Sequence, residues 1–148
     1  LIVFGAGVIG CEYAGIFAAL GVDVTLIDAR EQVLPFLDAD ISHALLDAFR
    51  GAGVRVVSAF QNVSAVHLKD LNHRIDCDVL VCGDDADARE QAVQLAEAAG
   101  MVAWHAGVLA NSAASEALPS VLIAINKRYK IPSSGIRITG VPRTDRGT

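Results

Sequence analysis

A chain of 148 residues in which 53% are hydrophobic but only 5% aromatic has the size of one domain and needs a core of aliphatic side chains. Strands buried on both faces between helices have this composition, so we expect an α/β fold. The net charge of −5 and the lack of a long basic run argue against nucleic acid as a partner, and no apolar run reaches the ~18 residues of a membrane span.

The same local pattern occurs three times along the chain: a helix-period run, a glycine, and then a β-branched strand. The three copies are residues 17–28, 47–57 and 96–104. In each copy the glycine can take the left-handed conformation that ends a helix before a strand begins. Helix followed by strand, repeated, predicts parallel βαβ units rather than hairpins.

The β-branched runs predict five strands and leave a sixth open. The five lie near residues 1–4, 23–27, 54–60, 78–82 and 101–104, and the sixth at 136–139. We therefore predict a three-layer, Rossmann-like α/β fold with a mostly parallel sheet of five or six strands and helices on both faces. Residues 1–148 should form a single domain with a loose tail at 142–148. The first three strands should follow the Rossmann order, with the later ones beyond the third.

Four helices are expected between these strands. The first starts inside a glycine-rich turn and ends near Leu20, and the second follows Asp38, a suitable N-cap. Asp84 and Asp85 should begin the third, because their carboxylates can accept unpaired helix N–H groups. The fourth lies within residues 112–129. We expect burial at the apolar positions with helical spacing: Ile41, Leu45 and Phe49, then Ala88, Ala92, Leu95 and Ala99, then Leu118, Val121, Leu122 and Ile125.

The opening strand runs directly into G-x-G-x-x-G, formed by Gly5, Gly7 and Gly10. Gly5 permits a tight turn, Gly7 lets a pyrophosphate approach the backbone, and Gly10 lets the helix pack close to the strand. Asp28 ends the next strand about 20 residues on, where an acid accepts hydrogen bonds from the adenosine ribose. A glycine turn that only packs well is the alternative. The motif predicts a dinucleotide site made by Gly5, Ala6, Gly7, Val8, Ile9, Gly10, Asp28, Ala29 and Arg30.

The end of the second strand bears on the choice of cofactor. Asp28 favours NAD, because a carboxylate repels the 2′-phosphate of NADP. Arg30 could pair with that phosphate, so NADP stays open. A plain turn role for Asp28 is the alternative. The predicted cofactor is therefore NAD or NADP, with NAD preferred.

The cysteines and histidines predict neither a disulfide nor a metal site. Cys77 and Cys82 have C-x4-C spacing, but a strand between them would separate their Cα atoms by about 16 Å, too far for a disulfide. Together with Cys11 they give three unpaired thiols, which fit a reducing, cytoplasmic location. The four histidines share no metal-ligand spacing, and we predict no catalytic side chain.

Residues 1–57 resemble the NAD-binding domain of soluble pyridine nucleotide transhydrogenases and related flavoprotein disulfide reductases. The segments GAGVIGCEYA and LPFLD carry this resemblance and occur in the right order. Those enzymes also have an FAD domain, in most members a redox-active cysteine pair, and a dimerisation domain, none of which we expect here. We leave open whether the chain forms a homodimer.

Residues 56–141 resemble the C-terminal half of the NADPH-dependent reductases of the deazaflavin coenzyme F-420. The segments VVSAFQNVSA, CDVLVCGDD, AGVLANS, NKRY and GIRITG carry this second resemblance. It implies that Gln61 and Val63 line the deazaflavin ring; an ordinary strand exit is the alternative. The chain departs from the family pattern at Val108, where Pro is expected, at Ala113, where a basic residue is common, and at Pro119–Ser120, where Thr-Pro is expected.

The two resemblances meet in one strand, so we expect a chimera, designed or recombined, with a single divergent family as the alternative. The chain begins on a strand without an initiator Met, which suggests a fragment or a recombinant. The implied reaction is hydride transfer between NAD(P)H and the deazaflavin, which needs alignment rather than an acid, base or nucleophile. The alternative function is a non-catalytic Rossmann-like chimera that at most binds NAD(P).

Overall fold

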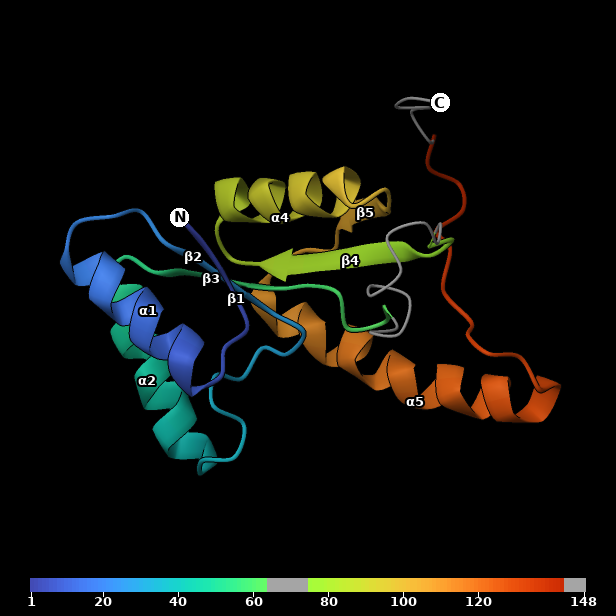
Figure 1. Ribbon diagram of the computed structural model, residues 1–148, viewed down its shortest axis with the longest axis horizontal. Helices are drawn as coiled ribbons and strands as arrows, with labels where there is room; N and C mark the ends of the chain where they lie inside the picture. The colour runs from blue at the N-terminus through green and yellow to red at the C-terminus, as the bar shows by residue number, and fades with distance from the viewer. Residues whose placement is uncertain (64–74, 143–148) are drawn as a thin grey trace.

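The computed structural model describes residues 1–63 and 75–142, which form an α/β fold with one five-stranded sheet (Figure 1). The strands β1 (Ile2–Phe4), β2 (Thr25–Asp28), β3 (Arg55–Ser58), β4 (Asp78–Gly83) and β5 (Val102–His105) stand side by side in chain order. The helices are α1 (Val8–Ala19), α2 (Ala39–Gly51), α4 (Ala86–Ala98) and α5 (Ser112–Tyr129), with a short 3-10 helix η1 (Leu109–Asn111) before α5. The predicted fold class is confirmed.

Glycines with positive φ end three of the helices. Gly21, Gly53 and Gly100 have φ of 80°, 82° and 80°, the conformation predicted for the repeated helix–glycine–strand pattern. After the first two, the chain enters β2 and β3, which pair in parallel with β1 and β2 respectively. The first three strands thus have the predicted Rossmann order, and β4 and β5 extend the sheet beyond β3.

The strand direction reverses between β3 and β4. These two strands are antiparallel, whereas β4 and β5 are parallel again. A right-handed crossover between reversed strands places its helix on the opposite face of the sheet. Accordingly, α4 lies on one side of the sheet and α1, α2 and α5 lie on the other (Figure 1). Because of this reversal, the carboxyl ends of β4 and β5 lie at one end of the sheet, and those of β1, β2 and β3 lie at the other end.

Each face of the sheet has its own aliphatic core. One core lies under α1 and α2 and is built mainly from Val24, Leu26, Leu46, Phe49 and Leu109. The other lies under α4 and is built mainly from Ile27, Val57, Val79, Val81, Ala88 and Ala92. Leu109 comes from η1 and packs among residues from the first third of the chain, so the two halves of the sequence share one of these cores.

The buried helix faces are rotated from the predicted ones. Ile41 and Val121 are exposed, and so is Ala99, which lies beyond the end of α4. Of the predicted positions, Phe49, Ala88, Ala92 and Leu122 are buried, and Leu45, Leu95, Leu118 and Ile125 are partly buried. In α2 the buried residues are Ser42, Leu46 and Phe49; the Ser42 hydroxyl donates to the Leu34 carbonyl, and Leu46 packs in the core with Leu109. Spacing alone does not distinguish two stripes that differ by one residue.

The predicted N-caps are partly right. Asp38 accepts a hydrogen bond from the Asp40 N–H, and Asp85 accepts one from the Ala88 N–H, so both residues cap helices as expected. Asp84 does not cap: its carboxylate pairs with Arg50 and accepts the Leu109 N–H. It therefore connects α2 to η1 instead of beginning α4.

The segment 136–139 is not a strand. Its link to the sheet runs through Asp78, whose N–H donates to the Ile136 carbonyl and whose carboxylate accepts the Ile138 N–H. A side chain replaces one main-chain acceptor here, so no ladder forms. Residues 143–148 of the predicted tail lie outside the described residues. No helix formed by the described residues has both the length and the apolar character of a membrane span.

The three cysteines are free, as predicted, and all three are buried. Burial raises the pKa of Cys11, Cys77 and Cys82 above the ordinary thiol value, and the Asp28 carboxylate adds to the shift at Cys11.

We therefore expect an alkylating reagent to leave all three thiols nearly unmodified in the native protein and to modify all of them in denaturant, which mass spectrometry would show. Stability should hold below the ordinary thiol pKa and fall above it, because the unfolded thiols release protons there while the folded thiols do not. A cysteine that reacts at its unfolded rate in the native protein would contradict the burial of that thiol.

Candidate dinucleotide site

The glycine-rich turn connects the end of β1 to the start of α1. Gly5 has φ of 102°, a backbone conformation that residues with a side chain rarely adopt. Gly10 faces the turn so closely that a Cβ atom there would overlap the Gly5 carbonyl oxygen. Around Gly7 there is free space, since a Cβ atom there would have no neighbour within 4 Å. Two of the three glycines are thus required by the fold itself, and the third leaves room beside the turn.

The start of α1 offers main-chain N–H groups to a ligand. The first intrahelical bond runs from the Cys11 N–H to the Gly7 carbonyl, so the N–H groups of Val8, Ile9 and Gly10 precede it. Helix N–H groups of this kind, with the helix dipole behind them, favour an anion such as a pyrophosphate. α1 carries no acidic residue in its first turn that would oppose this charge.

Asp28 holds the end of β2 against the turn. One carboxylate oxygen accepts the Ala6 N–H at 2.7 Å, and the other accepts the N–H and Nε–H of Arg30 at 3.0 Å each. The Asp28 side chain is only 8% exposed, whereas that of Arg30 is 46% exposed. The hydrogen bond that the Arg30 guanidinium donates to the Asp28 carboxylate raises the pKa of Arg30, which keeps its charge. A cation, rather than the carboxylate, is therefore the more exposed group beside Ala29.

Gln61 and Val63, the residues predicted to line the deazaflavin ring, lie after β3, at the same end of the sheet as the glycine turn. Phe60 has φ of 69°, and its ring packs edge-on against that of Phe4 with centroids 5.5 Å apart. The next residues, Gln61, Asn62 and Val63, line a cavity of about 230 Å³. Its other walls come from α5 and the segment that follows: Pro119, Leu122, Ile123, Asn126, Pro132, Ser133 and Ser134.

Within the part of the chain that the structure describes, three amide oxygens of the cavity-lining residues are buried and have no hydrogen-bond partner: Gln61 Oε1, Asn62 Oδ1 and Asn126 Oδ1. The Asn62 amide is oriented by its Nδ2, which donates to the Asp78 carbonyl at 2.8 Å, so the oxygen is the atom left over. Buried acceptors without partners are rare and costly. The resemblance places Phe60 and Asn62 beside Gln61 and Val63, but Asn126 was not predicted, because only the packing of α5 brings it to this cavity.

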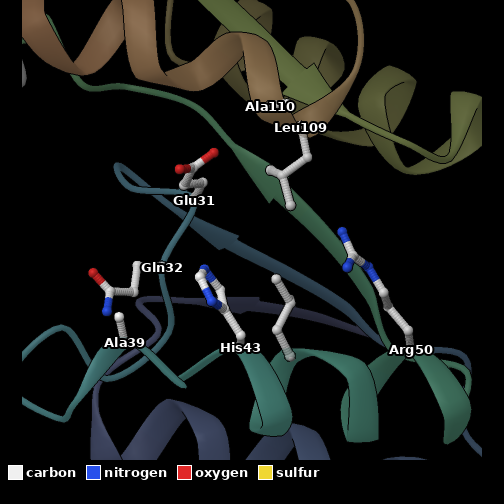
Figure 2. Close-up of a pocket in the computed structure, with 8 residues that line it drawn as sticks. Glu31, Gln32, Ala39, His43, Arg50, Leu109 and Ala110 are labelled. Carbon is white, nitrogen blue, oxygen red and sulfur yellow. The ribbon is translucent and has the colours of Figure 1, made fainter. Parts of the chain in front are cut away.

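A second cavity of about 270 Å³ contains none of the predicted residues. It lies between α2 and η1, and Figure 2 shows His43 and Arg50 extending into it from α2, with Leu109 on the opposite side. Arg50 is held by Asp84 at 2.9 Å, and Glu31 accepts a hydrogen bond from the Ser112 hydroxyl. No sequence motif identifies this cavity, because it forms where the two halves of the chain meet.

The model of the pyridine nucleotide-disulphide oxidoreductase family matches residues 1–74. A soluble pyridine nucleotide transhydrogenase of Pseudomonas syringae is 46% identical over 89 residues, which are 55% of this chain and 19% of the relative. An F420-dependent NADP reductase of Methanocaldococcus jannaschii is 44% identical over 88 residues, 59% of this chain and 40% of the relative. The chain thus spans less than half the length of either relative.

These two matches bear out both predicted resemblances. Their shares of this chain add up to more than the whole, so the two matched segments overlap. A solved structure of a putative F420-dependent NADP reductase from Arthrobacter covers 82% of this chain with a TM-score of 0.61 and 18% identity, over 60% of its own length. At that identity the likeness shows the common fold.

Proposed function

The chain belongs to the pyridine nucleotide-disulphide oxidoreductase family and is an NAD(P)-binding oxidoreductase domain, and from this premise we propose that its dinucleotide binds at the glycine turn. The observation that carries the proposal is the turn itself, with free space at Gly7 and the N–H groups of Val8, Ile9 and Gly10 at the start of α1. The pyrophosphate lies over these N–H groups, and the adenosine ribose lies near Asp28, Ala29 and Arg30.

Two charged side chains lie at the end of β2, and they have different roles. The Asp28 carboxylate supports the turn through Ala6, and the more exposed Arg30 guanidinium meets the solvent. A guanidinium there accommodates a 2′-phosphate, so the proposal includes NADP as well as NAD. Titration calorimetry with each dinucleotide tests it, and no heat of binding with either would reject the site.

The finer proposal is that the bound nicotinamide exchanges a hydride with a deazaflavin near Gln61 and Val63. Support comes from the relatives named F420-dependent NADP reductase and from the cavity of about 230 Å³ that Gln61, Asn62 and Val63 line. In this reaction the hydride leaves C4 of reduced nicotinamide, and the deazaflavin takes up that hydride and one proton from water. The chain contributes alignment and exclusion of water.

An absorbance assay tests this exchange. Reduced NAD or NADP is mixed with oxidised deazaflavin coenzyme, and the deazaflavin absorbance is followed at several protein concentrations. A decay rate proportional to protein concentration is expected. The matched control is Gly7→Val, which should show no catalysed decay because it no longer binds the dinucleotide. No catalysed decay, together with measurable NAD binding, would reject the exchange and keep the binding domain.

The second candidate function is dinucleotide binding without turnover. The order of the sheet favours it, because the cavity at Gln61 lies beyond β3 while the turn begins at β1, with β2 between them. A hydride moves only over a short, aligned contact.

A further inference from the structure

The first two turns of α5 hold the loop that follows β2. The Glu116 carboxylate accepts the N–H of Glu31, a residue 85 positions away in the sequence, at 2.7 Å. The Ser112 hydroxyl donates to the Glu31 carboxylate at 3.2 Å. Ser112 and Glu116 are four residues apart on one helix, so their side chains lie on the same face. α5 therefore brings a carboxylate of the second half of the chain to the end of β2.

Glu116 changes the charge around Arg30. The hydrogen bond to Asp28 raises the pKa of the Arg30 guanidinium, and the negative charges of Asp28 and Glu116 raise it further. The guanidinium is already paired with Asp28 at 3.0 Å. One positive and two negative side chains leave an excess of one negative charge beside Ala29, although the more exposed of the Asp28–Arg30 pair is the cation.

This excess matters for a phosphate on the adenosine ribose, which the proposed site places near Asp28 and Arg30. A phosphate monoester such as the 2′-phosphate of NADP carries a charge of about −1.5 to −2 at neutral pH, whereas NAD has a hydroxyl there. Like charges in one site repel each other. Glu116 is only partly exposed, so water and salt screen its charge incompletely.

We propose that Glu116 is a specificity-determining residue of the dinucleotide site: its carboxylate disfavours the 2′-phosphate, so that this chain binds NAD more tightly than NADP. The proposal rests on the proposed dinucleotide site and adds to it a residue of α5 that the glycine motif does not include. Asp28 is a weaker discriminator, because its two oxygens are already bonded to the Ala6 N–H and to Arg30.

Titration calorimetry with NAD and NADP on the wild type and three variants tests this. Glu116→Gln keeps an oxygen that can accept the Glu31 N–H and removes only the charge. Its affinity for NADP should rise about fivefold, or about 1 kcal/mol, while its affinity for NAD stays within about twofold. Glu116→Asp keeps the charge on a shorter side chain and should keep the preference for NAD.

Glu90→Gln is the matched control. Glu90 lies on α4, on the other face of the sheet from α5, and its substitution makes the same change in net charge (Figure 1). This variant should leave both dissociation constants unchanged. Melting temperatures of all the variants, measured alongside, show whether each protein is folded under the conditions of the titration.

Four results would overturn the proposal and keep the dinucleotide site. They are tighter binding of NADP than of NAD by the wild type, an unchanged ratio of the two affinities in Glu116→Gln, the same change of ratio in Glu90→Gln, and a loss of the NAD preference in folded Glu116→Asp. Loss of both affinities to the same extent in Glu116→Gln would also overturn it, because Glu116 would then only support the loop. Binding of neither dinucleotide by the wild type would instead reject the dinucleotide site itself, and the proposal with it.

Discussion

Gly7→Val is expected to abolish dinucleotide binding in a protein that stays folded, whereas Gly10→Ala is expected to unfold the turn that Gly7→Val leaves intact. The two glycines lie three residues apart in the same motif. Their surroundings differ, because a Cβ atom at Gly7 meets nothing within 4 Å and one at Gly10 overlaps the Gly5 carbonyl.

The backbone at Gly7 accepts a side chain. Its φ of −78° and ψ of −176° lie in the extended region that valine adopts readily. Valine is a poorer N-cap than glycine, which costs about 1 kcal/mol or less. Its two methyl groups would occupy the space beside the turn that the proposal gives to the pyrophosphate. We expect the dissociation constant for NAD to rise at least 100-fold, or about 2.7 kcal/mol.

At Gly10 the neighbouring atom is a backbone oxygen, which cannot rotate away. α1 must move off the turn to make room, at a cost of about 3 kcal/mol or more, since it exceeds ordinary overpacking. Gly15→Ala is the matched control on the same helix. A Cβ atom there lies 3.6 Å from the Phe49 ring, an ordinary contact, and alanine stabilises a helix interior by about 0.5–1 kcal/mol relative to glycine.

Thermal unfolding and NAD titration, measured on all three variants, check the prediction. Gly7→Val should lose binding while its melting temperature falls by no more than about 4 °C, Gly10→Ala should lose stability, and Gly15→Ala should keep binding with equal or higher stability. NAD affinity that survives in Gly7→Val would show that the dinucleotide does not lie on this turn.

Local signals in the sequence were enough for the elements of the fold but not for their arrangement. Gly21, Gly53 and Gly100 each follow a helical run, and a positive φ is a property of a few neighbouring residues, so it could be predicted. The antiparallel pairing of β3 with β4 depends on contacts between strands far apart in the chain. Nothing within either strand specifies the direction of its neighbour, and the edge position of β1 follows from that pairing.

The candidate site also has a part that could be predicted from local sequence and a part that could not. The turn from Gly5 to Gly10 is a contiguous motif whose geometry follows from its own residues. Asn62 and Asn126 become neighbours only when α5 packs beside the exit of β3, so their unpartnered oxygens could not be predicted. Arg30 was predicted, but its partnership with Asp28 changes which of the two charges is more exposed.

Polar contacts join the two halves of the chain that resemble different families. Thr25 donates to Gln91 on α4, Arg50 pairs with Asp84, and Glu31 accepts from Ser112. Exposed ion pairs such as Arg50–Asp84 contribute little to stability. The burial of Leu109 among residues of the first half contributes more, because it removes apolar surface from water.

Asp78→Ala is expected to destabilise the second half of the sheet and to release the segment after α5. Asp78 is 1% exposed, and one oxygen of its carboxylate accepts both the Trp104 Nε1–H at 2.8 Å and the Ile138 N–H at 2.7 Å. Alanine would leave two donors without this acceptor, each at a cost of about 1–3 kcal/mol if it stays buried. We expect a loss of about 3 kcal/mol, which lowers the melting temperature by roughly 6–12 °C.

Asp78→Asn is the matched control, because an amide oxygen in the same position can still accept both donors. The loss of charge should weaken these bonds and cost about 1 kcal/mol. Trp104 is the only tryptophan of the chain, so its fluorescence reports directly on this contact. The emission should shift in Asp78→Ala at temperatures where the protein is still folded, and much less in Asp78→Asn. Equal stability and equal emission in the two variants would show that the carboxylate does not hold Trp104 and Ile138 together.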